Sequence, residues 1–395
     1  MAPHPGTQRW KSAEALLRAE PRTTPRYFFL VGSVTFIERL ARIPHYSAGA
    51  DSAEAAARES ASVAMLASNE SPFPPVEGVV EAVRRAAGEV NRYPDPGAGA
   101  LRRALADRYE HPLSGIAVGN GSCEILLAAA EALLEPWSEI VYAWPSFSMY
   151  PHLAATTDAR EVTVPLADGY VHDLDALAGA VTEQTRLMLV CNPNNPTGTH
   201  VPSDAVGGLL ERIPRRVLVI LDEAYIEFQT VEDPDASLDL LRRFDNLVIL
   251  RTFSKAYGLA GLRVGFALGS EDFKAAVDRV RQPFSVNHLA QTAATEALRH
   301  QDDVARRVEW NVVERLWMEE ELAELGLDVA ASQANFCWVS LGDHDEREIL
   351  DALSRAGVAV RPGMGLGGPG HLRVTYGTRA ENERFIAALR GAIAS

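Results

Sequence analysis

Short apolar segments alternate with helix-like stretches along the chain from about residue 76. Five of them are almost wholly apolar, at 140–143, 187–191, 217–221, 247–250 and 264–268. Short apolar segments without polar alternation are typical of strands buried on both faces, as in a parallel sheet covered by helices. The pattern therefore predicts an α/β fold, with a large domain over 76–285 whose mostly parallel sheet is flanked by helices.

The pattern changes beyond about residue 283. A long helix is expected over 302–325, with one buried apolar stripe formed by Val304, Val308, Val312 and Leu316. Three strand-like segments and a last helix follow, at 335–340, 358–361, 371–375 and 379–393. These elements predict a smaller α+β domain over 286–395, and residues 39–75 are expected to form an N-terminal arm and part of that small domain.

Residues 1–38 show no sustained hydrophobic period, so we expect a poorly ordered leader or a start codon set too far upstream. The apolar run at 27–37 has only about half the length that a membrane-spanning helix needs. No small-residue cleavage site follows this run. Neither a membrane anchor nor a secretion signal is therefore expected.

Composition and charge narrow the possible functions. Asp and Glu number 53 against 38 Lys and Arg, a formal net charge of −15, which would repel the phosphate backbone of a nucleic acid. The three cysteines, Cys123, Cys191 and Cys337, are far apart, and the ten histidines form no HxxxH pair. We therefore expect neither disulfides nor a metal site, no nucleic-acid or membrane partner, and a reducing, cytoplasmic location.

Only three of the basic residues are lysines: Lys11, Lys255 and Lys274. Lys11 belongs to the leader, and Lys274 lies in a polar helical stretch where a solvated ammonium is expected. Lys255 alone follows a buried strand. A desolvated lysine loses its proton near neutral pH and can act as a nucleophile or form a Schiff base. Lys255 is therefore the candidate for amine chemistry.

Polar residues follow three of the predicted buried strands. Asn192-Pro-Asn-Asn-Pro-Thr-Gly198 follows the first strand, Asp222-Glu-Ala-Tyr225 the next, and the segment from Arg251 to Arg263, with Lys255, the third. The carboxyl ends of parallel strands meet at one edge of a sheet, where ligands bind. The Asn-rich motif alone is equally consistent with an ordinary turn. Asp222, next to a buried strand, requires a cationic partner.

Together these residues suit pyridoxal phosphate. A lysine can bind its aldehyde, an aspartate its ring nitrogen, an asparagine and a tyrosine its ring oxygen, and an arginine its phosphate. Gly119-Asn-Gly-Ser-Cys-Glu124 precedes an apolar helix expected over 125–134, whose free N–H groups near Ser122 and Cys123 suit a phosphate. Phe147 offers an aromatic face for the ring, although an aromatic side chain there is as often part of the core.

In their order and spacing these motifs resemble those of the fold-type I pyridoxal-phosphate aminotransferases, and among them the histidinol-phosphate aminotransferase family. The resemblance extends from about residue 43 to the C-terminus. It includes three further segments: Leu66-Ala-Ser-Asn-Glu-Ser, Asn91-Arg-Tyr-Pro-Asp-Pro and Leu372-Arg-Val-Thr-Tyr-Gly-Thr378. The chain departs from the family at Cys123, where a carboxylate is common, and at Phe147, where a tyrosine is common.

The resemblance implies a role for each candidate residue. Lys255 would be the aldimine lysine and proton shuttle, Asp222 the partner of the pyridinium nitrogen, and Phe147 the stacking ring. The phenolate oxygen would be bound by Asn195 and Tyr225. The cofactor phosphate would be bound by Ser122, Cys123, Ser254, Arg263 and, from the other subunit of a homodimer, Tyr93. The substrate would be bound by Arg373, Arg361, Tyr46 and Asn69.

The function implied is a transaminase, in first place histidinol-phosphate transaminase of histidine biosynthesis, which exchanges an amino group between histidinol phosphate and 2-oxoglutarate. An aromatic-amino-acid aminotransferase is the alternative, because only a few pocket residues separate the two. Arg373 argues against a decarboxylase of a phosphorylated amino acid, because it would clamp the carboxylate in plane. A sensor domain fused to a DNA-binding module is disfavoured, since residues 1–45 show no helix-turn-helix pattern.

Overall fold

The computed structural model describes residues 29–31, 34–43, 50–59 and 62–394. The chain divides into two compact units, 1–42 and 43–395. The first unit contains a short antiparallel pair, β1 (Phe29–Val31) and β2 (Val34–Phe36), and a 3-10 turn, η1 (Glu38–Arg42). The sequence pattern does not predict this pair. Most of the expected leader, and the candidate Tyr46, lie outside the described residues.

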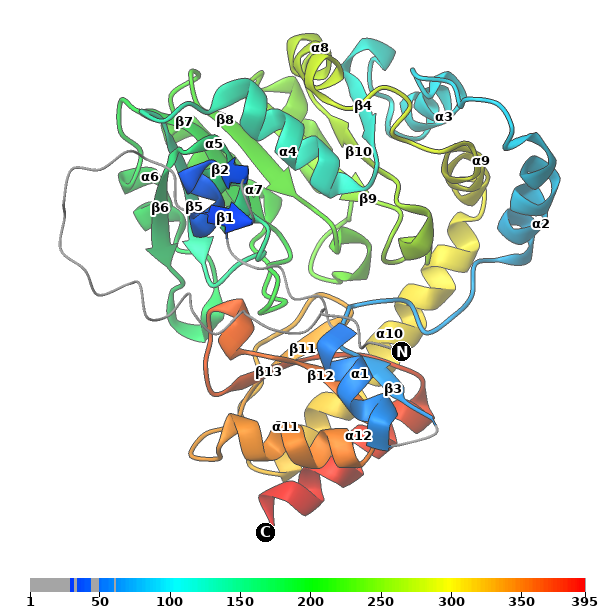
Figure 1. Cartoon of the computed structure of the whole chain (residues 1–395), viewed down its shortest axis with the longest axis vertical. Helices are drawn as coiled ribbons and strands as arrows, with labels where there is room; N and C mark the ends of the chain where they lie inside the picture. The colour runs from blue at the N-terminus through cyan, green and yellow to red at the C-terminus, as the bar shows by residue number, and fades with distance from the viewer. Residues whose placement is uncertain (1–28, 32–33, 44–49, 60–61, 395) are drawn as a thin grey trace. The chain divides into compact units, whose positions relative to one another are not determined.

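A seven-stranded sheet is the framework of the second unit (Figure 1). Its strands lie in the order β4 (Ile116–Gly119), β10 (Gly265–Leu268), β9 (Leu247–Thr252), β8 (Leu218–Asp222), β7 (Thr185–Cys191), β5 (Glu139–Trp144) and β6 (Arg160–Pro165). The five strands from β9 to β6 are parallel, and β10 runs antiparallel to its neighbours. The predicted α/β fold with a mostly parallel sheet is confirmed, and each of the five apolar segments contains a strand.

Helices cover both faces of this sheet, which explains why its strands lack polar alternation. Along β7, Leu187 and Leu189 pack in one apolar cluster with α4 (Ser122–Leu133), α5 (Tyr150–Thr157) and α8 (Glu271–Val280). The residue between them, Met188, points to the opposite face and packs with α6 (Leu174–Gly179) and α7 (Ser203–Arg212). Because successive strand residues face opposite sides, each one meets a helix.

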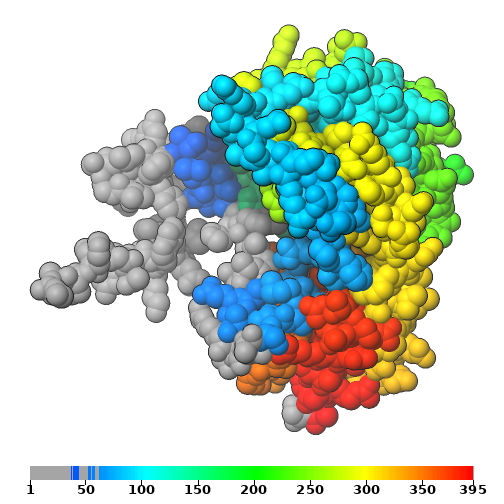
Figure 2. Space-filling view, turned by 90° about the vertical axis from the view of Figure 1, so that its right-hand side faces the viewer, coloured from blue at the N-terminus to red at the C-terminus, as the bar shows by residue number. Residues whose placement is uncertain are grey.

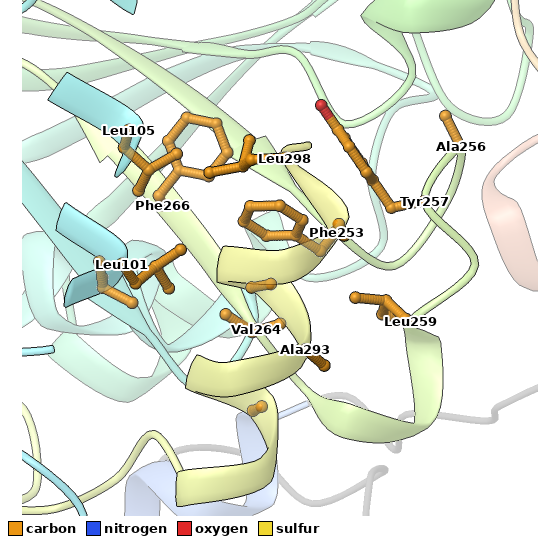
Figure 3. Close-up of a cluster of buried hydrophobic side chains, with 14 of the residues drawn as sticks. Leu101, Leu105, Phe253, Ala256, Tyr257, Leu259, Val264, Phe266, Ala293 and Leu298 are labelled. Carbon is orange, nitrogen blue, oxygen red and sulfur yellow. The ribbon is translucent and has the colours of Figure 1, made fainter. Parts of the chain in front are cut away.

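A third apolar cluster joins one end of the sheet to α2 (Glu77–Ala86), α3 (Gly99–Tyr109) and α9 (His288–Ala297). Figure 3 shows Leu101 and Leu105 of α3 facing Phe266, with Phe253 between them and α9. This cluster supports the segment that follows β9, because Phe253 is fully buried in it. Two residues further along the chain is Lys255.

A second sheet belongs to the smaller part of this unit. Its order is β11 (Phe336–Ser340), β13 (His371–Thr375), β12 (Val358–Pro362) and β3 (Ala64–Leu66), the last parallel to β12. The helices grouped with it are α1 (Ala50–Glu59), α10 (Gln301–Glu324), α11 (Glu346–Arg355) and α12 (Arg379–Ile393). A segment from the N-terminal quarter of the chain therefore completes a sheet made from its last sixty residues.

The apolar stripe predicted for the long helix is wrong in part. Val304 is buried, but Leu316 is 57% exposed. Each step of four residues advances about 40° around a helix of 3.6 residues per turn, so Leu316 lies about 120° from Val304. The buried face of α10 instead follows alternating steps of three and four through Asn311, Arg315, Met318 and Leu322.

Membrane-spanning helices and groups of metal-binding side chains are both absent from the described part of the chain. None of its helices is both long and apolar enough to cross a bilayer. Within the same residues, no three His, Cys, Asp or Glu side chains are grouped where they could bind a metal ion. The three cysteines are free thiols, and two of them, Cys191 and Cys337, are buried.

Replacing Leu105, which is fully buried in the cluster of Figure 3, tests the packing of α3. We expect Leu105→Ala to lower the free energy of unfolding by about 2–5 kcal/mol, since it removes buried methyl groups and leaves a cavity. Leu316→Ala on α10 is the matched control, and its exposed side chain predicts a change within about 0.5 kcal/mol. Urea unfolding measures both, and equal losses would contradict the burial assigned to these two leucines.

Candidate active site

A cavity of 370 Å³ lies where the carboxyl ends of the parallel strands meet residues from the smaller sheet. It brings together residues predicted from separate motifs. Its lining includes Asn69, Ser122, Cys123, Phe147, Asn195, Asp222, Tyr225, Ser254, Lys255, Arg263, Arg361 and Arg373. Among the predicted site residues that the structure describes, Tyr93 alone is absent from this lining.

Asp222 ends β8 and is almost fully buried. Its Oδ2 accepts a hydrogen bond from the Tyr150 hydroxyl at 3.0 Å, whereas its buried Oδ1 has no hydrogen-bond partner. Burial raises the pKa of Asp222 to about 6. No cation of the described residues pairs with it, so the cationic partner that the sequence predicts is not a side chain from this part of the protein. The free oxygen suits a protonated nitrogen of a ligand.

The adjacent carboxylate, Glu223, forms an ion pair with an arginine. Its Oε2 accepts from Arg251 Nε at 2.8 Å, and Arg251 Nη1 lies 2.7 Å from Asp235 Oδ1. Arg251 is 2% exposed, and its guanidinium also lies over the Tyr109 ring. This buried ion pair is not predicted by the sequence pattern, in which an arginine four residues before Lys255 is the only signal for it. Arg251 is therefore paired with Glu223 and Asp235 rather than with Asp222.

Lys255 lies in the loop after β9 with its amine inside the cavity. Nζ donates hydrogen bonds to the carbonyl oxygens of Ser68 at 3.1 Å and Asn69 at 3.0 Å. Burial, together with the nearby cation of Arg373, lowers the pKa of Lys255 to about 8. With a pKa of about 8, roughly a tenth of this amine is unprotonated at pH ~7 and about half at pH ~8, which supplies the free amine that a nucleophile or base requires.

The Tyr225 hydroxyl lies between two asparagine amides. It accepts from Asn69 Nδ2 at 3.0 Å and from Asn195 Nδ2 at 3.3 Å. Arg373 Nη1 donates to Asn195 Oδ1 at 2.7 Å, which turns the amide nitrogen of Asn195 toward Tyr225. Burial raises the pKa of Tyr225, so its phenol stays protonated. Both lone pairs of the oxygen are engaged, and the hydroxyl proton is left to donate into the cavity.

The start of α4 lies close to Arg263 and Ser254, as the expected phosphate site requires. Gly121 precedes the helix with φ +75°, and a Cβ there would lie 2.3 Å from Arg263 Nη2. A Cβ on Gly265 would lie 2.5 Å from the Ser122 nitrogen. The two glycines therefore let the helix N-terminus, Arg263 and Ser254 approach one another, with Arg263 Nη1 3.4 Å from Ser254 Oγ. Free N–H groups beside a guanidinium suit a phosphate.

Two buried arginines from the smaller sheet form the opposite wall. Arg361 on β12 and Arg373 on β13 are directly opposed in the antiparallel register, and each is 7% exposed. Directly opposed residues project from the same face of a sheet, and two like charges in that position repel. An anionic ligand group beside them would be attracted by both guanidinium groups. Arg373 also donates to the Ala67 carbonyl at 2.7 Å.

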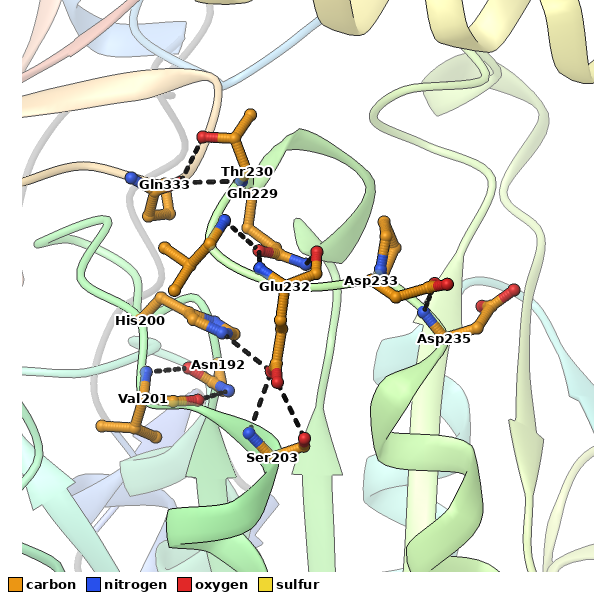
Figure 4. Close-up of polar contacts among 12 residues, drawn as sticks. Asn192, His200, Val201, Ser203, Gln229, Thr230, Glu232, Asp233, Asp235 and Gln333 are labelled. Atoms are coloured by element: carbon orange, nitrogen blue, oxygen red, sulfur yellow. Dashed lines mark hydrogen bonds and ion pairs between the residues drawn. The ribbon is translucent and has the colours of Figure 1, made fainter.

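The remaining asparagines of the 192–198 motif have structural roles. Asn192 closes the loop after β7, donating to the Val201 carbonyl at 2.8 Å and accepting from the Val201 amide at 2.9 Å (Figure 4). Asn194 binds the Pro145 carbonyl and two side chains, Ser146 and Thr197. The interpretation as a turn is therefore correct for two of the three asparagines, and Asn195 reaches the cavity.

Further hydrogen bonds join the loop after β7 to the segment around Glu232. Glu232 accepts from both the amide and the hydroxyl of Ser203, and its Oε1 lies 3.2 Å from His200 Nε2 (Figure 4). Gln333, from the segment before β11, accepts from the Thr230 amide at 2.9 Å. These bonds tie the strand-end loops to the smaller part of the unit beside the cavity.

Tyr93 lies away from the cavity and is 83% exposed. Its ring stacks on Phe284 with centroids 4.7 Å apart, and Val90 nearby is also exposed. Tyr93 borders a surface hollow lined by residues of α2 and α9. These two helices pack side by side, and Figure 2 shows them in blue and yellow. The predicted role of Tyr93 in a second subunit's site requires an exposed side chain of this kind.

Comparison with known proteins identifies relatives over nearly the whole described unit. Residues 61–389 match the family model for aminotransferase class I and II. An aromatic amino acid aminotransferase of Streptomyces coelicolor is 45% identical over 87% of this chain and 93% of its own length. Histidinol-phosphate aminotransferase 2 of Ralstonia nicotianae is 44% identical over 85% of this chain and 90% of its own.

The fold agrees with that of a solved relative. The structure of histidinol-phosphate aminotransferase from Sinorhizobium meliloti in complex with pyridoxal phosphate matches with a TM-score of 0.82 at 30% identity, over 91% of this chain and 97% of that one. The site geometry, the family match and these relatives agree. The chain belongs to the class I and II aminotransferases, the pyridoxal-phosphate-dependent transaminases of fold type I.

Proposed function

We propose that this transaminase exchanges an amino group between glutamate and an aromatic 2-oxo acid. The observation that carries the proposal is the opposed pair of buried arginines, Arg361 and Arg373, which suits a carboxylate at one end of the cavity. Apolar groups from Phe147 and Leu366 also line the cavity, as an aromatic side chain requires. The aromatic aminotransferases of Streptomyces coelicolor and Thermobifida fusca, both 45% identical, support this substrate class.

Histidinol phosphate is the second candidate, and it is the one favoured by the sequence motifs. Two adjacent guanidinium groups also suit a phosphate ester, whose net charge approaches about −2 at neutral pH. The relatives from Ralstonia nicotianae and Sinorhizobium meliloti carry this name at 44% and 30% identity. Both candidates have a planar ring and an anionic group, which would suit the same cavity.

The residues of the cavity fit pyridoxal phosphate. The unpartnered Oδ1 of Asp222 suits the protonated ring nitrogen, and the glycine-lined start of α4 with Arg263 suits the phosphate. Phe147 would stack on the ring, with the Tyr225 hydroxyl donating to the ring oxygen. When bound, the cofactor supplies an aldehyde that accepts the amino group and a ring that withdraws electrons.

The protein groups then bind substrate and move protons. Arg373 would bind the carboxylate while it holds Asn195, and Arg361 would bind a second anionic group such as the distal carboxylate of glutamate. Lys255 Nζ would accept the proton from the substrate Cα and return a proton during transfer, which its lowered pKa permits. The carboxylate of Asp222 would keep the ring nitrogen protonated, because burial would strengthen their attraction.

A half-reaction separates the two substrate classes. The purified enzyme, loaded with pyridoxal phosphate, is mixed with phenylalanine in one cuvette and with histidinol phosphate in another. Conversion of the cofactor to its amine form, followed by absorbance, is expected with phenylalanine at a rate at least about tenfold above that with histidinol phosphate. The opposite ratio would replace the aromatic proposal by the second candidate, and no conversion by either would overturn both.

The lowered pKa of Lys255 predicts how the rate at which the cofactor-free protein binds pyridoxal phosphate depends on pH. Only the unprotonated amine attacks the aldehyde, so the rate should rise about tenfold per pH unit below the pKa and level off above about 8. Stopped-flow absorbance measures this rate. A rate that still climbs near pH ~10, as for an ordinary lysine, would contradict a buried amine.

Matched lysine variants identify the group. Lys255→Ala should abolish covalent uptake and lower turnover by a factor of about a hundred to ten thousand. Lys274→Ala removes a lysine that pairs with Asp278 on α8, and should change neither quantity. Loss of uptake in both variants would indicate a general effect of charge rather than a role for Lys255.

We also propose a cytoplasmic homodimer with shared active sites. The exposed Tyr93 and Phe284 pair provides apolar surface for a second copy, and three free cysteines are compatible with a reducing compartment. Tyr93 would reach the cofactor phosphate of the other subunit. Each active site would then combine Lys255 of one chain with Tyr93 of its partner.

Complementation between Tyr93→Ala and Lys255→Ala tests this arrangement, with activity measured at a pyridoxal phosphate concentration that leaves most Tyr93→Ala sites empty. Tyr93→Ala should weaken cofactor binding by about tenfold, the cost of one lost hydrogen bond. After subunit exchange, an equal mixture of Tyr93→Ala and Lys255→Ala should regain up to about a quarter of the wild-type activity, because half of the dimers contain one intact site. Sedimentation should show twice the chain mass of 42.9 kDa. A mixture no more active than its components would refute the shared site.

A further inference from the structure

Thr375, the last residue of β13, lies behind the active site and is 1% exposed. Its Oγ1 accepts a hydrogen bond from the backbone nitrogen of Asn69 at 2.9 Å and donates one to the side-chain oxygen Oδ1 of Asn69 at 3.1 Å. These two bonds join residues separated by 306 positions in the chain. Thr375 does not line the cavity, and its contact is with Asn69, which does.

The threonine determines which way the Asn69 amide faces. Because its oxygen already accepts from the Asn69 backbone, the hydroxyl proton is directed to the side-chain oxygen of the same residue. The amide nitrogen is then turned away from Thr375 and toward the Tyr225 hydroxyl, to which it donates at 3.0 Å. The reversed amide would leave the buried hydroxyl proton without its acceptor, which costs free energy.

Asn69 needs this support because its backbone is unusual. Its φ is +53°, a left-handed conformation in which asparagine is tolerated better than most residues. Its carbonyl oxygen accepts from Lys255 Nζ and from Asn335 Nδ2 at 3.2 Å. Asn69 thus contacts both the amine and the phenol of the active site, and Thr375 is bonded to both its backbone and its side chain.

The consequence reaches the cavity through Tyr225. With one lone pair accepting from Asn69 and the other from Asn195, the phenol is a donor toward the ligand. If Asn69 presented its oxygen instead, the phenol proton would be attracted to that oxygen and away from the cavity. The orientation of one amide therefore decides whether Tyr225 donates a hydrogen bond to the cofactor.

We propose that Thr375 is a positioning residue that acts through Asn69 to hold the Tyr225 hydroxyl as a donor to the ring oxygen of pyridoxal phosphate. This inference rests on the proposed function, since it requires the cofactor to occupy the cavity. Thr375 touches neither substrate nor cofactor. Its effect is on the charge distribution of the bound cofactor, which is visible without any turnover.

The absorbance of the bound cofactor, titrated with pH in the absence of substrate, measures that effect. The Lys255 nitrogen and the ring oxygen share a proton when the cofactor is bound, and donation from Tyr225 to the oxygen weakens its hold on that proton. Thr375→Val removes the hydroxyl at nearly constant volume. We expect the midpoint of the titration to move upward by about half a pH unit or more. Thr375→Ser, which retains the hydroxyl, should keep the wild-type midpoint.

The matched control is Thr185→Val at the start of β7. Thr185 is also fully buried, and its Oγ1 likewise accepts from one backbone amide, that of Thr182, and donates to one oxygen, Oε2 of Glu139. It lies at the opposite end of the strand from the cavity. Its loss should lower stability to a comparable extent and leave the midpoint unchanged. A shift of equal size in this control would assign the effect to destabilisation and overturn the proposal.

A second variant keeps the test valid if Thr375→Val folds poorly. Asn69→Gly tolerates the positive φ and removes both the side-chain amide that Thr375 orients and the oxygen that would attract the Tyr225 proton, so in this background the loss of the Thr375 hydroxyl should no longer move the midpoint. The double variant Asn69→Gly/Thr375→Val should therefore have the midpoint of Asn69→Gly alone, because Thr375 acts through Asn69. A further shift in the double variant would overturn the proposal. Failure of the wild-type chain to bind pyridoxal phosphate would overturn the proposed function, whereas normal binding with unshifted midpoints would overturn only the role of Thr375.

Discussion

The burial of the Asp222 carboxylate at the end of β8 is the constraint on which the active site depends. Helices cover both faces of the sheet and exclude water from this carboxylate. Protein groups take the place of the solvent, among them the Tyr150 hydroxyl, which donates to Asp222 Oδ2. Removing a carboxylate from water costs free energy unless a cation or hydrogen-bond donors take the place of the solvent. The partnerless Oδ1 therefore favours a ligand that brings a protonated nitrogen to this edge of the sheet.

The protein keeps its own cations away from that oxygen. Arg251 lies on the adjacent strand but binds Glu223 and Asp235, and successive residues point to opposite sides of the backbone, so Asp222 faces elsewhere. Two other buried guanidinium groups, those of Arg361 and Arg373, belong to the smaller sheet. This separation leaves one part of the cavity suited to a protonated nitrogen, beside Asp222, and another suited to a carboxylate, beside Arg361 and Arg373.

The smaller sheet contributes more than its arginines. β3 leads directly to Asn69, and β13 carries Arg373 and Thr375, so two segments about 300 residues apart orient the two amides that bind the Tyr225 hydroxyl. Arg373 holds one amide and Thr375 the other. Arg373, the proposed substrate-binding group, and Thr375, which does not line the cavity, are thereby joined to the same phenol. This coupling depends on the register between β12, β13 and β3 rather than on any local motif.

The sequence by itself determined the parallel sheet and most of the candidate site. Strands buried on both faces leave apolar segments without alternation, and the carboxyl ends of such strands meet, so Asn195, Asp222 and Lys255 were expected together. The edge strand β6 escaped prediction because its exposed positions include Arg160 and Glu161. Only the tertiary structure decided that Leu316 faces solvent, that Tyr150 solvates Asp222 and that Thr375 orients Asn69. Such contacts depend on register and side-chain direction between distant segments, which local periodicity does not encode.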